Sequence, residues 1–180
     1  MKALQRQMAF IEASTATKTA GDCKRALERS IDHKFDRPVK YTQNAIAVRP
    51  ALKSRPVARV FVKDRQAGYL IYQARGGIRT PKGKSLVVPV NARCNRYGNL
   101  SRNYLKNQLA KPNVFSGKVN SVAGVYQRMK SGHMKLLVAF EPQARYRKRW
   151  NPDSIVRRTA SRSMPIHYRM QLRAAFRQIF

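Results

Sequence analysis

The stretch of the sequence with the most phosphate-binding chemistry is GGIRTPKGKS, residues 76–85. Its glycines and its Gly-Lys-Ser ending are the residue types with which nucleotide-binding loops wrap backbone amides around a phosphate. The spacing is wrong for such a loop, because Ile78 stands where the first glycine is required and Pro81 has no amide hydrogen to donate. Residues 86–90 are β-branched and contain a proline, which favours a strand over the helix that the loop needs. We therefore interpret residues 76–85 as a basic loop.

A second candidate site is a row of acidic residues at four-residue spacing, Glu28, Asp32 and Asp36. Carboxylates spaced in this way share one face of a helix and could bind a divalent metal ion, as a metal-dependent nuclease would require. Lys24 and Arg25 lie among these acids, however, and ion pairs between residues four apart explain the pattern without a metal. We favour the ion pairs.

Other residues with nucleophilic or metal-binding chemistry are scattered along the chain. His33, His133 and His167 fall in different predicted elements, and no serine lies in a nucleophile elbow. Cys23 and Cys94 stand far apart with no second thiol nearby, which predicts packed apolar side chains rather than a disulfide or a zinc site. We therefore expect no enzymatic activity, no metal and no cofactor.

Cations alternate with aromatic rings in RYRKRW, residues 145–150. Nucleic-acid-binding surfaces use this mixture, because bases stack on rings while guanidinium groups hold phosphate. The same residues also fit a solvated loop that Tyr146 and Trp150 anchor on the core. Both interpretations stay open, because positive charge is spread over the whole chain.

The net charge predicts an acidic or polyanionic partner. The 180 residues include 38 Lys and Arg against 8 Asp and Glu, a formal charge of +30, while 43% are hydrophobic, enough for a real core. A compact body with this charge repels itself unless something anionic lies against it. No acid occurs from Arg65 to Phe140, where single cations alternate with apolar residues as on a folded basic surface.

The sequence contains no signal for a membrane. No run approaches the roughly twenty apolar residues of a membrane span, and the N-terminal residues are too polar for a secretory signal. We expect a chain that is made and kept in the cytoplasm, with no membrane partner.

Hydrophobic spacing predicts that a single α+β domain, residues 1–180, positions these groups. Its parts are a long N-terminal helix (1–34), a mixed, mostly antiparallel sheet region with basic loops (44–141) and C-terminal helices (151–180). The clearest hairpin joins residues 122–128 to residues 134–140 through a glycine-containing turn.

Shorter elements complete the predicted fold. Residues 44–48 and 57–63 are expected to pair as antiparallel strands. Residues 104–109 predict a short helix, and residues 114–119 a turn-rich segment. Residues 66–74 fit either a strand or a short helix.

Two helix-breaking residues and one apolar stripe shape the expectations for the helices. Gly21 predicts a kink or a break in the N-terminal helix. Pro165 is expected to divide the C-terminal segment into two helices. In the second of these, Tyr168, Leu172 and Phe176 predict an apolar face for packing.

The order of several short motifs resembles phage minor tail protein Z and related tail completion proteins. The resemblance covers most of the chain, and no single motif is specific. It departs from the family at residues 74–77, ARGG, where many relatives have a glutamate before a Gly-Thr pair. The segments that carry it are YLIYQ (69–73) followed by GG (76–77) and RTP (79–81), FDRP (35–38), residues 83–90, YGNL (97–100), VAGVYQR (122–128) and LLVAFEP (136–142).

This resemblance implies a non-enzymatic virion component, an α+β subunit of a ring that completes the tail or joins it to the head in the neck. The implied partners are tail tube, tail terminator and head–tail adaptor proteins and further copies of the chain, with phage DNA as a further contact. A basic nucleic-acid-binding protein, ribosomal or nucleoid-type, is the alternative. We expect subunit or DNA contacts at Arg75, Gly76, Gly77, Arg79, Lys82, Lys84, Arg145, Arg147, Lys148 and Arg149.

Overall fold

The computed structural model describes residues 2–179, and the chain folds into two compact units. The first unit comprises Met1–Arg75 and Lys148–Phe180, and the second unit is the intervening Gly76–Arg147. Each unit has its own hydrophobic core. The prediction of one domain over residues 1–180 did not include these boundaries, because both fall within basic stretches with no change in composition.

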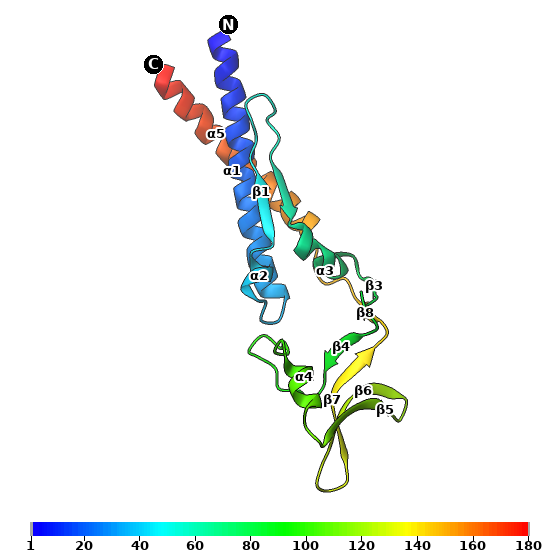
Figure 1. Ribbon diagram of the computed structural model, residues 1–180. Helices are drawn as coiled ribbons and strands as arrows, with labels where there is room; N and C mark the ends of the chain where they lie inside the picture. The colour runs from blue at the N-terminus through cyan, green and yellow to red at the C-terminus, as the bar shows by residue number, and fades with distance from the viewer. Residues whose placement is uncertain (1, 180) are drawn as a thin grey trace. The chain divides into compact units, whose positions relative to one another are not determined.

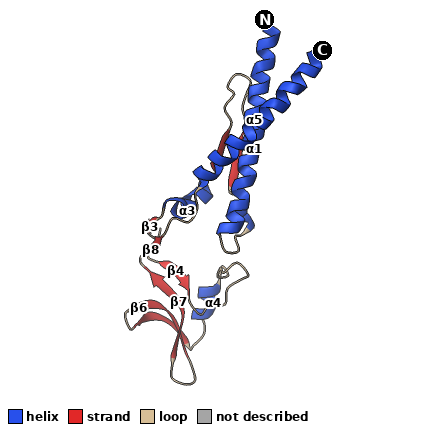
Figure 2. Cartoon of the chain, turned by 180° about the vertical axis from the view of Figure 1, so that it is seen from behind, coloured by secondary structure: helices blue, strands red, loops and turns tan. Residues whose placement is uncertain are grey.

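Two long helices form the frame of the first unit. Helices α1 (Lys2–Lys34) and α5 (Pro152–Ile179) lie side by side and antiparallel, with both chain termini at the same end of the pair (Figures 1 and 2). Contacts near both ends of the pair fix this arrangement, because Ser14 bonds Gln171 and Ser30 bonds Trp150. The other elements are α2 (Lys40–Gln43), the antiparallel strands β1 (Ile46–Arg49) and β2 (Arg59–Val62), and α3 (Asp64–Arg75).

The core of the first unit gathers around Trp150. Its ring is 2% exposed and packs edge-on against Phe35, and its indole N–H donates to Ser30 Oγ at 2.9 Å. Leu27 and Ile31, four residues apart on α1, present one apolar stripe to this cluster. The N-terminal helix is therefore tied to Trp150, two residues before the start of α5.

The second unit is built on a four-stranded antiparallel sheet with strand order β4-β7-β6-β5. Its core lies between this sheet and α4, and includes Tyr104, Val125 and Val138. A separate two-stranded sheet pairs β3 with β8. The elements are β3 (Gly77–Arg79), β4 (Leu86–Pro89), α4 (Tyr104–Leu109), β5 (Val114–Val119), β6 (Val122–Arg128), β7 (Met134–Glu141) and β8 (Ala144–Tyr146).

The α+β fold class is confirmed, as are the two hairpins and the short helix α4. The open choice at residues 66–74 is decided in favour of a helix, because α3 spans Asp64–Arg75. Leu70 is the apolar residue that α3 buries in the core around Trp150, whereas Ile71 is exposed. A strand would have placed alternate residues on each face, but α3 needs only one apolar stripe.

Both predicted helix breaks are wrong. Helix α1 continues through Gly21, because the helix packs against neighbours on both sides of this residue and offsets the cost of about 1 kcal/mol for an interior glycine. Helix α5 continues through Pro165, so the C-terminal helices are one helix. Proline removes one backbone hydrogen-bond donor from the helix. The cost is tolerated because Pro165 is exposed and the same helical turn is held against α1 by the contact of His167 with Asp22.

Three further expectations are corrected. Residues 114–119 form strand β5, which pairs along its whole length with β6, rather than a turn-rich segment. The first part of the basic loop, Gly77–Arg79, is strand β3. In α5, Tyr168 and Phe176 are 37% and 53% exposed, because the face that meets α1 carries His167 and Gln171 instead.

We predict that Gly124→Ala destabilises the four-stranded sheet. A Cβ at this position would lie 2.3 Å from the carbonyl oxygen of Val138 and 2.7 Å from a methyl group of Leu136, so the backbone of the sheet must shift. The free energy of unfolding, measured in urea, should fall by about 2 kcal/mol or more.

Gly117→Ala is the matched control, because Gly117 lies directly opposite Gly124 in the β5–β6 ladder. A Cβ there meets only the Phe115 ring at 3.4 Å, a side chain that can move. Its effect should stay within about 1 kcal/mol. Equal destabilisation by the two substitutions would contradict the close-approach argument.

Candidate anion-binding surface

The structure brings together two basic segments that lie far apart in the sequence. Strands β3 and β8 pair antiparallel, so that Gly77 faces Tyr146, Ile78 faces Arg145 and Arg79 faces Ala144. The basic loop and the first half of RYRKRW therefore form one ribbon within the second unit. We call β3, β8 and the basic residues that flank them, Lys82, Lys84 and Arg147, the basic ribbon.

The cations of the basic ribbon differ in exposure. Arg145 and Arg147 are exposed, and so are Lys82 and Lys84 in the bend after β3. Arg79 is half-buried, on the face of the ribbon that it shares with Ala144 and Tyr146. Among the described residues none of these cations has an acidic partner, so their charge is free to meet an external anion.

Two glycines lie where the chain enters the basic ribbon. Gly76 and Gly77 have φ angles of 76° and 114°, a region that side chains rarely allow. These two residues let the chain leave α3 and enter β3 directly.

The predicted site residues Arg75, Lys148 and Arg149 belong to the first unit. Arg149 has structural contacts: its Nε donates to Gln73 Oε1 at 2.6 Å, and its guanidinium lies 5.1 Å from the Phe35 ring centroid. Its Nη1 is 3.8 Å from Asp36, an exposed ion pair of little energetic value. Trp150 anchors the core, so RYRKRW is divided between an exposed ribbon and a buried anchor.

Almost all the charged residues around the basic ribbon are positive. The second unit contains fourteen Lys and Arg and a single acid, Glu141. Since counter-charges are almost absent from the unit, its cations reinforce each other's attraction for an anion. The ribbon offers hydrogen-bond donors and positive charge, which is the chemistry of phosphate or carboxylate binding.

The predicted acidic row is engaged with neighbouring side chains, and its last member, Asp36, lies beyond the end of α1. Glu28 lies 3.7 Å from Lys24 Nζ, which confirms the predicted ion pair between residues four apart. Asp32 accepts a hydrogen bond from Gln43 Nε2 at 2.9 Å, and Asp36 faces Arg149. In the part of the chain that the structure describes, no three His, Cys, Asp or Glu side chains are close enough to hold one metal ion.

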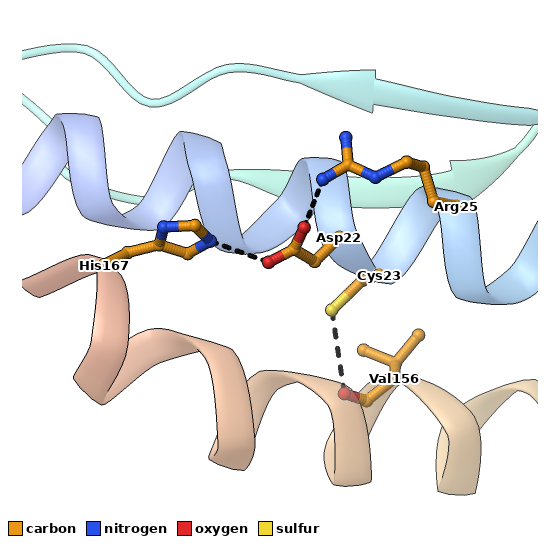
Figure 3. A network of polar contacts seen from close by, with 5 residues as sticks. All are labelled: Asp22, Cys23, Arg25, Val156 and His167. Atoms are coloured by element: carbon orange, nitrogen blue, oxygen red, sulfur yellow. Dashed lines mark hydrogen bonds and ion pairs between the residues drawn. The ribbon is translucent and has the colours of Figure 1, made fainter.

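A polar network that the sequence analysis missed joins α1 to α5. His167 Nε2 lies 2.6 Å from Asp22 Oδ2, and the other carboxylate oxygen of Asp22 contacts Arg25 (Figure 3). The pair is half-buried, with side chains 23% and 20% exposed for Asp22 and His167. Only the Asp22–Arg25 contact is visible as a spacing in the sequence. His167 is 145 residues away, and no periodicity links it to Asp22.

The same network contains a cysteine, a histidine and an aspartate, but these residues are not arranged as a nucleophile and its base. The Cys23 thiol points toward the backbone carbonyl of Val156, at 3.7 Å, and not toward His167 (Figure 3). Burial, with the Asp22 carboxylate nearby, raises the pKa of the Cys23 thiol. A protonated, 2% exposed thiol is a packed side chain rather than a nucleophile.

Comparison of the chain with known proteins gives no family. Neither the family models nor the curated proteins nor the solved structures contain a match. Among the residues that the structure describes, no helix combines the length and apolar character needed to cross a membrane.

We predict that Asp22→Asn weakens the fold near neutral pH and much less in acid. Burial alone would raise the pKa of Asp22, but its hydrogen bond to His167 and the charges of His167 and Arg25 outweigh burial, so the pKa is lowered from 3.8. A lowered carboxyl pKa stabilises the fold above the ordinary value, and this stabilisation is lost as the pH falls through the folded-state value. At pH 6 the free energy of unfolding of the wild type should exceed that of the variant by about 1 to 2 kcal/mol.

The measurement is urea unfolding at a series of pH values from 6 downward. The difference between wild type and Asp22→Asn should shrink as the pH drops below 3.8. Glu12→Gln removes the same charge from an exposed position of α1 and should change stability by less than about 0.5 kcal/mol. A difference that stays constant with pH would show that Asp22 contributes packing rather than charge.

Proposed function

We propose that this protein is a non-enzymatic structural subunit of a phage virion, which completes the tail or joins the tail to the head as part of a ring. The order of motifs that resembles tail completion proteins supports this proposal. The observation that carries it is the amount of surface that the chain leaves exposed.

The accessible surface is 13541 Å² for a chain of 20.6 kDa. A globular monomer of this mass exposes about 8,900 Å², and two separate globules with the masses of the two units expose about 10,700 Å² together. The chain therefore exposes about 2,900 Å² more than two independent globules would. An excess of this size matches what one subunit buries in extensive contacts with its neighbours in an assembly.

The exposed surface includes apolar side chains from most elements of the chain. In the first unit they lie on both long helices and on the β1–β2 hairpin, and in the second unit on β4 and at the tip of the β6–β7 hairpin. Strands β4 and β5 are also open edges of the four-stranded sheet. Residues with such exposure include Phe10, Leu52, Phe61, Val87, Val88, Met129, Met134, Met164, Ile166, Met170 and Phe176.

The charge fits a subunit that is covered by acidic neighbours or lies beside packaged DNA. A body with a formal charge of +30 gains free energy when it is placed between acidic rings or next to a phosphate backbone. On this proposal the chain is in the host cytoplasm before assembly and in the tail or neck of the particle afterwards. Its partners are tail tube, tail terminator and head–tail adaptor proteins.

We predict that the purified protein is an oligomer whose native mass is several times 20.6 kDa. Light scattering at moderate salt, with and without a short duplex DNA, makes this measurement. A discrete oligomer that forms without DNA supports the ring subunit. A monomer that binds DNA with a steep salt dependence would contradict it.

A basic nucleic-acid-binding protein is the second candidate, and the unpaired cations of the basic ribbon favour it. If the ribbon binds phosphates, each lost contact should lower the slope of log affinity against log salt by about 0.9. We predict that the triple variant Lys82→Gln, Arg145→Gln and Arg147→Gln lowers this slope by about 2 to 3 for duplex DNA.

The control for this test removes the same charge elsewhere in the second unit. Arg102, Lys118 and Lys130 are exposed and lie outside the basic ribbon. Their replacement by glutamine should leave the slope close to that of wild type. Equal changes of slope in the two triple variants would mean that DNA affinity depends only on the net charge and not on the basic ribbon.

A further inference from the structure

A groove of about 660 Å³ lies between α1 and α5 in the first unit, and only residues of these two helices line it. Its floor is made of half-buried residues at four-residue spacing, one row from each helix. Most of these residues are small or apolar, so another backbone can approach closely. The α1 row is Asp22, Ala26 and Ser30, and the α5 row is Ile155, Thr159 and Ser163.

Exposed cations line both rims of the groove at the same spacing. Arg25 and Arg29 follow the α1 rim, and Arg158 and Arg162 follow the α5 rim. Four-residue steps place the members of each row on successive turns of one helix face. The groove therefore has a narrow, largely uncharged floor between two parallel rows of positive charge.

Few of these charges are neutralised within the chain. Asp22 is the only acid in the groove, and it is already engaged by His167 and Arg25. Among the described residues, Arg29, Arg158 and Arg162 have no acidic partner. The Oγ of Ser163 is buried in the floor without a hydrogen-bond partner. An external ligand could therefore supply carboxylates to these arginines and a hydrogen-bond partner to the Ser163 hydroxyl.

We propose that this groove docks an acidic amphipathic helix of a partner protein. A third helix laid between two packed helices places its central stripe on the floor and its two edges against the rims. Small or apolar residues in the central stripe would cover Ala26 and Ile155. Aspartate or glutamate along both edges would pair with the arginines, whose guanidinium groups hold carboxylates in a bidentate fork.

The floor favours a helix over a nucleic acid. A phosphodiester backbone gains from the arginines but has no apolar group to place against Ala26 and Ile155, and its phosphates would keep this floor wet. A helix uses the rims and the floor together. The groove is about three turns long, which corresponds to a partner segment of roughly 12 residues.

A second copy of this chain does not fit as the occupant. The chain has 8 acids in all. Glu28 and Asp32 on α1 are already engaged, by Lys24 and Gln43, and Asp36, just beyond the end of α1, faces Arg149. Among the described residues, no helix presents acids along two edges. The partner must therefore be an acidic protein, inside a virion or outside one, so this inference does not depend on the proposed function.

The test uses the full-length protein and a fluorescent helical peptide with glutamates on both edges and alanine and leucine between them. The groove variant carries Arg29→Gln, Arg158→Gln and Arg162→Gln. The matched control carries Arg169→Gln, Arg173→Gln and Arg177→Gln, which remove the same charge from exposed positions of α5 outside the groove. Affinity is measured by fluorescence anisotropy, with circular dichroism to verify that both variants fold.

The groove variant should bind the glutamate peptide about tenfold more weakly than wild type or worse, while the control stays within about twofold. A peptide with glutamine in place of glutamate should bind all three proteins weakly. The two variants should bind duplex DNA with similar affinity. Equal loss of peptide binding in both variants, no loss in either, or a loss confined to DNA would each overturn the proposal.

Discussion

The backbone carbonyl of Gln73 and the side chain of Trp150 hold the chain together where it leaves the first unit and returns to it. The backbone N–H groups of Arg149 and Trp150 both donate to the Gln73 carbonyl at 3.0 Å, and the Trp150 indole donates to Ser30 on α1. These bonds fix the end of α3 beside the start of α5. The pairing of α1 with α5 and the insertion of the whole second unit at this point depend on them.

The interface between α1 and α5 is more polar than helix packing requires. Thr15, Thr19 and Ser163 have buried hydroxyls without partners, and the contacts that do form include Ser14 with Gln171 and Asp22 with His167. Unpaired buried hydroxyls cost stability, so this helix pair gains less from association than an apolar pair would.

Positive charge is used in two different geometries. In the second unit, a two-stranded ribbon carries cations that have no acidic partner among the described residues. In the first unit, the groove between the long helices sets arginines on the rims of a narrow floor, and a ligand must match both the charge and the width. Net charge alone therefore attracts anionic partners, while the fold decides which of them fits.

The sequence by itself determined the α+β class, most of the elements and the excess of positive charge. Period-two alternation predicted the β6–β7 hairpin, and the scarcity of acids between Arg65 and Phe140 predicted a basic surface there. Local pattern failed at Gly21 and Pro165, where packing between α1 and α5 outweighs the cost of one poor helix residue. Only the tertiary structure decided which cations come together, since β3 meets β8 and Asp22 meets His167 through long-range contacts that leave no periodic trace in the sequence.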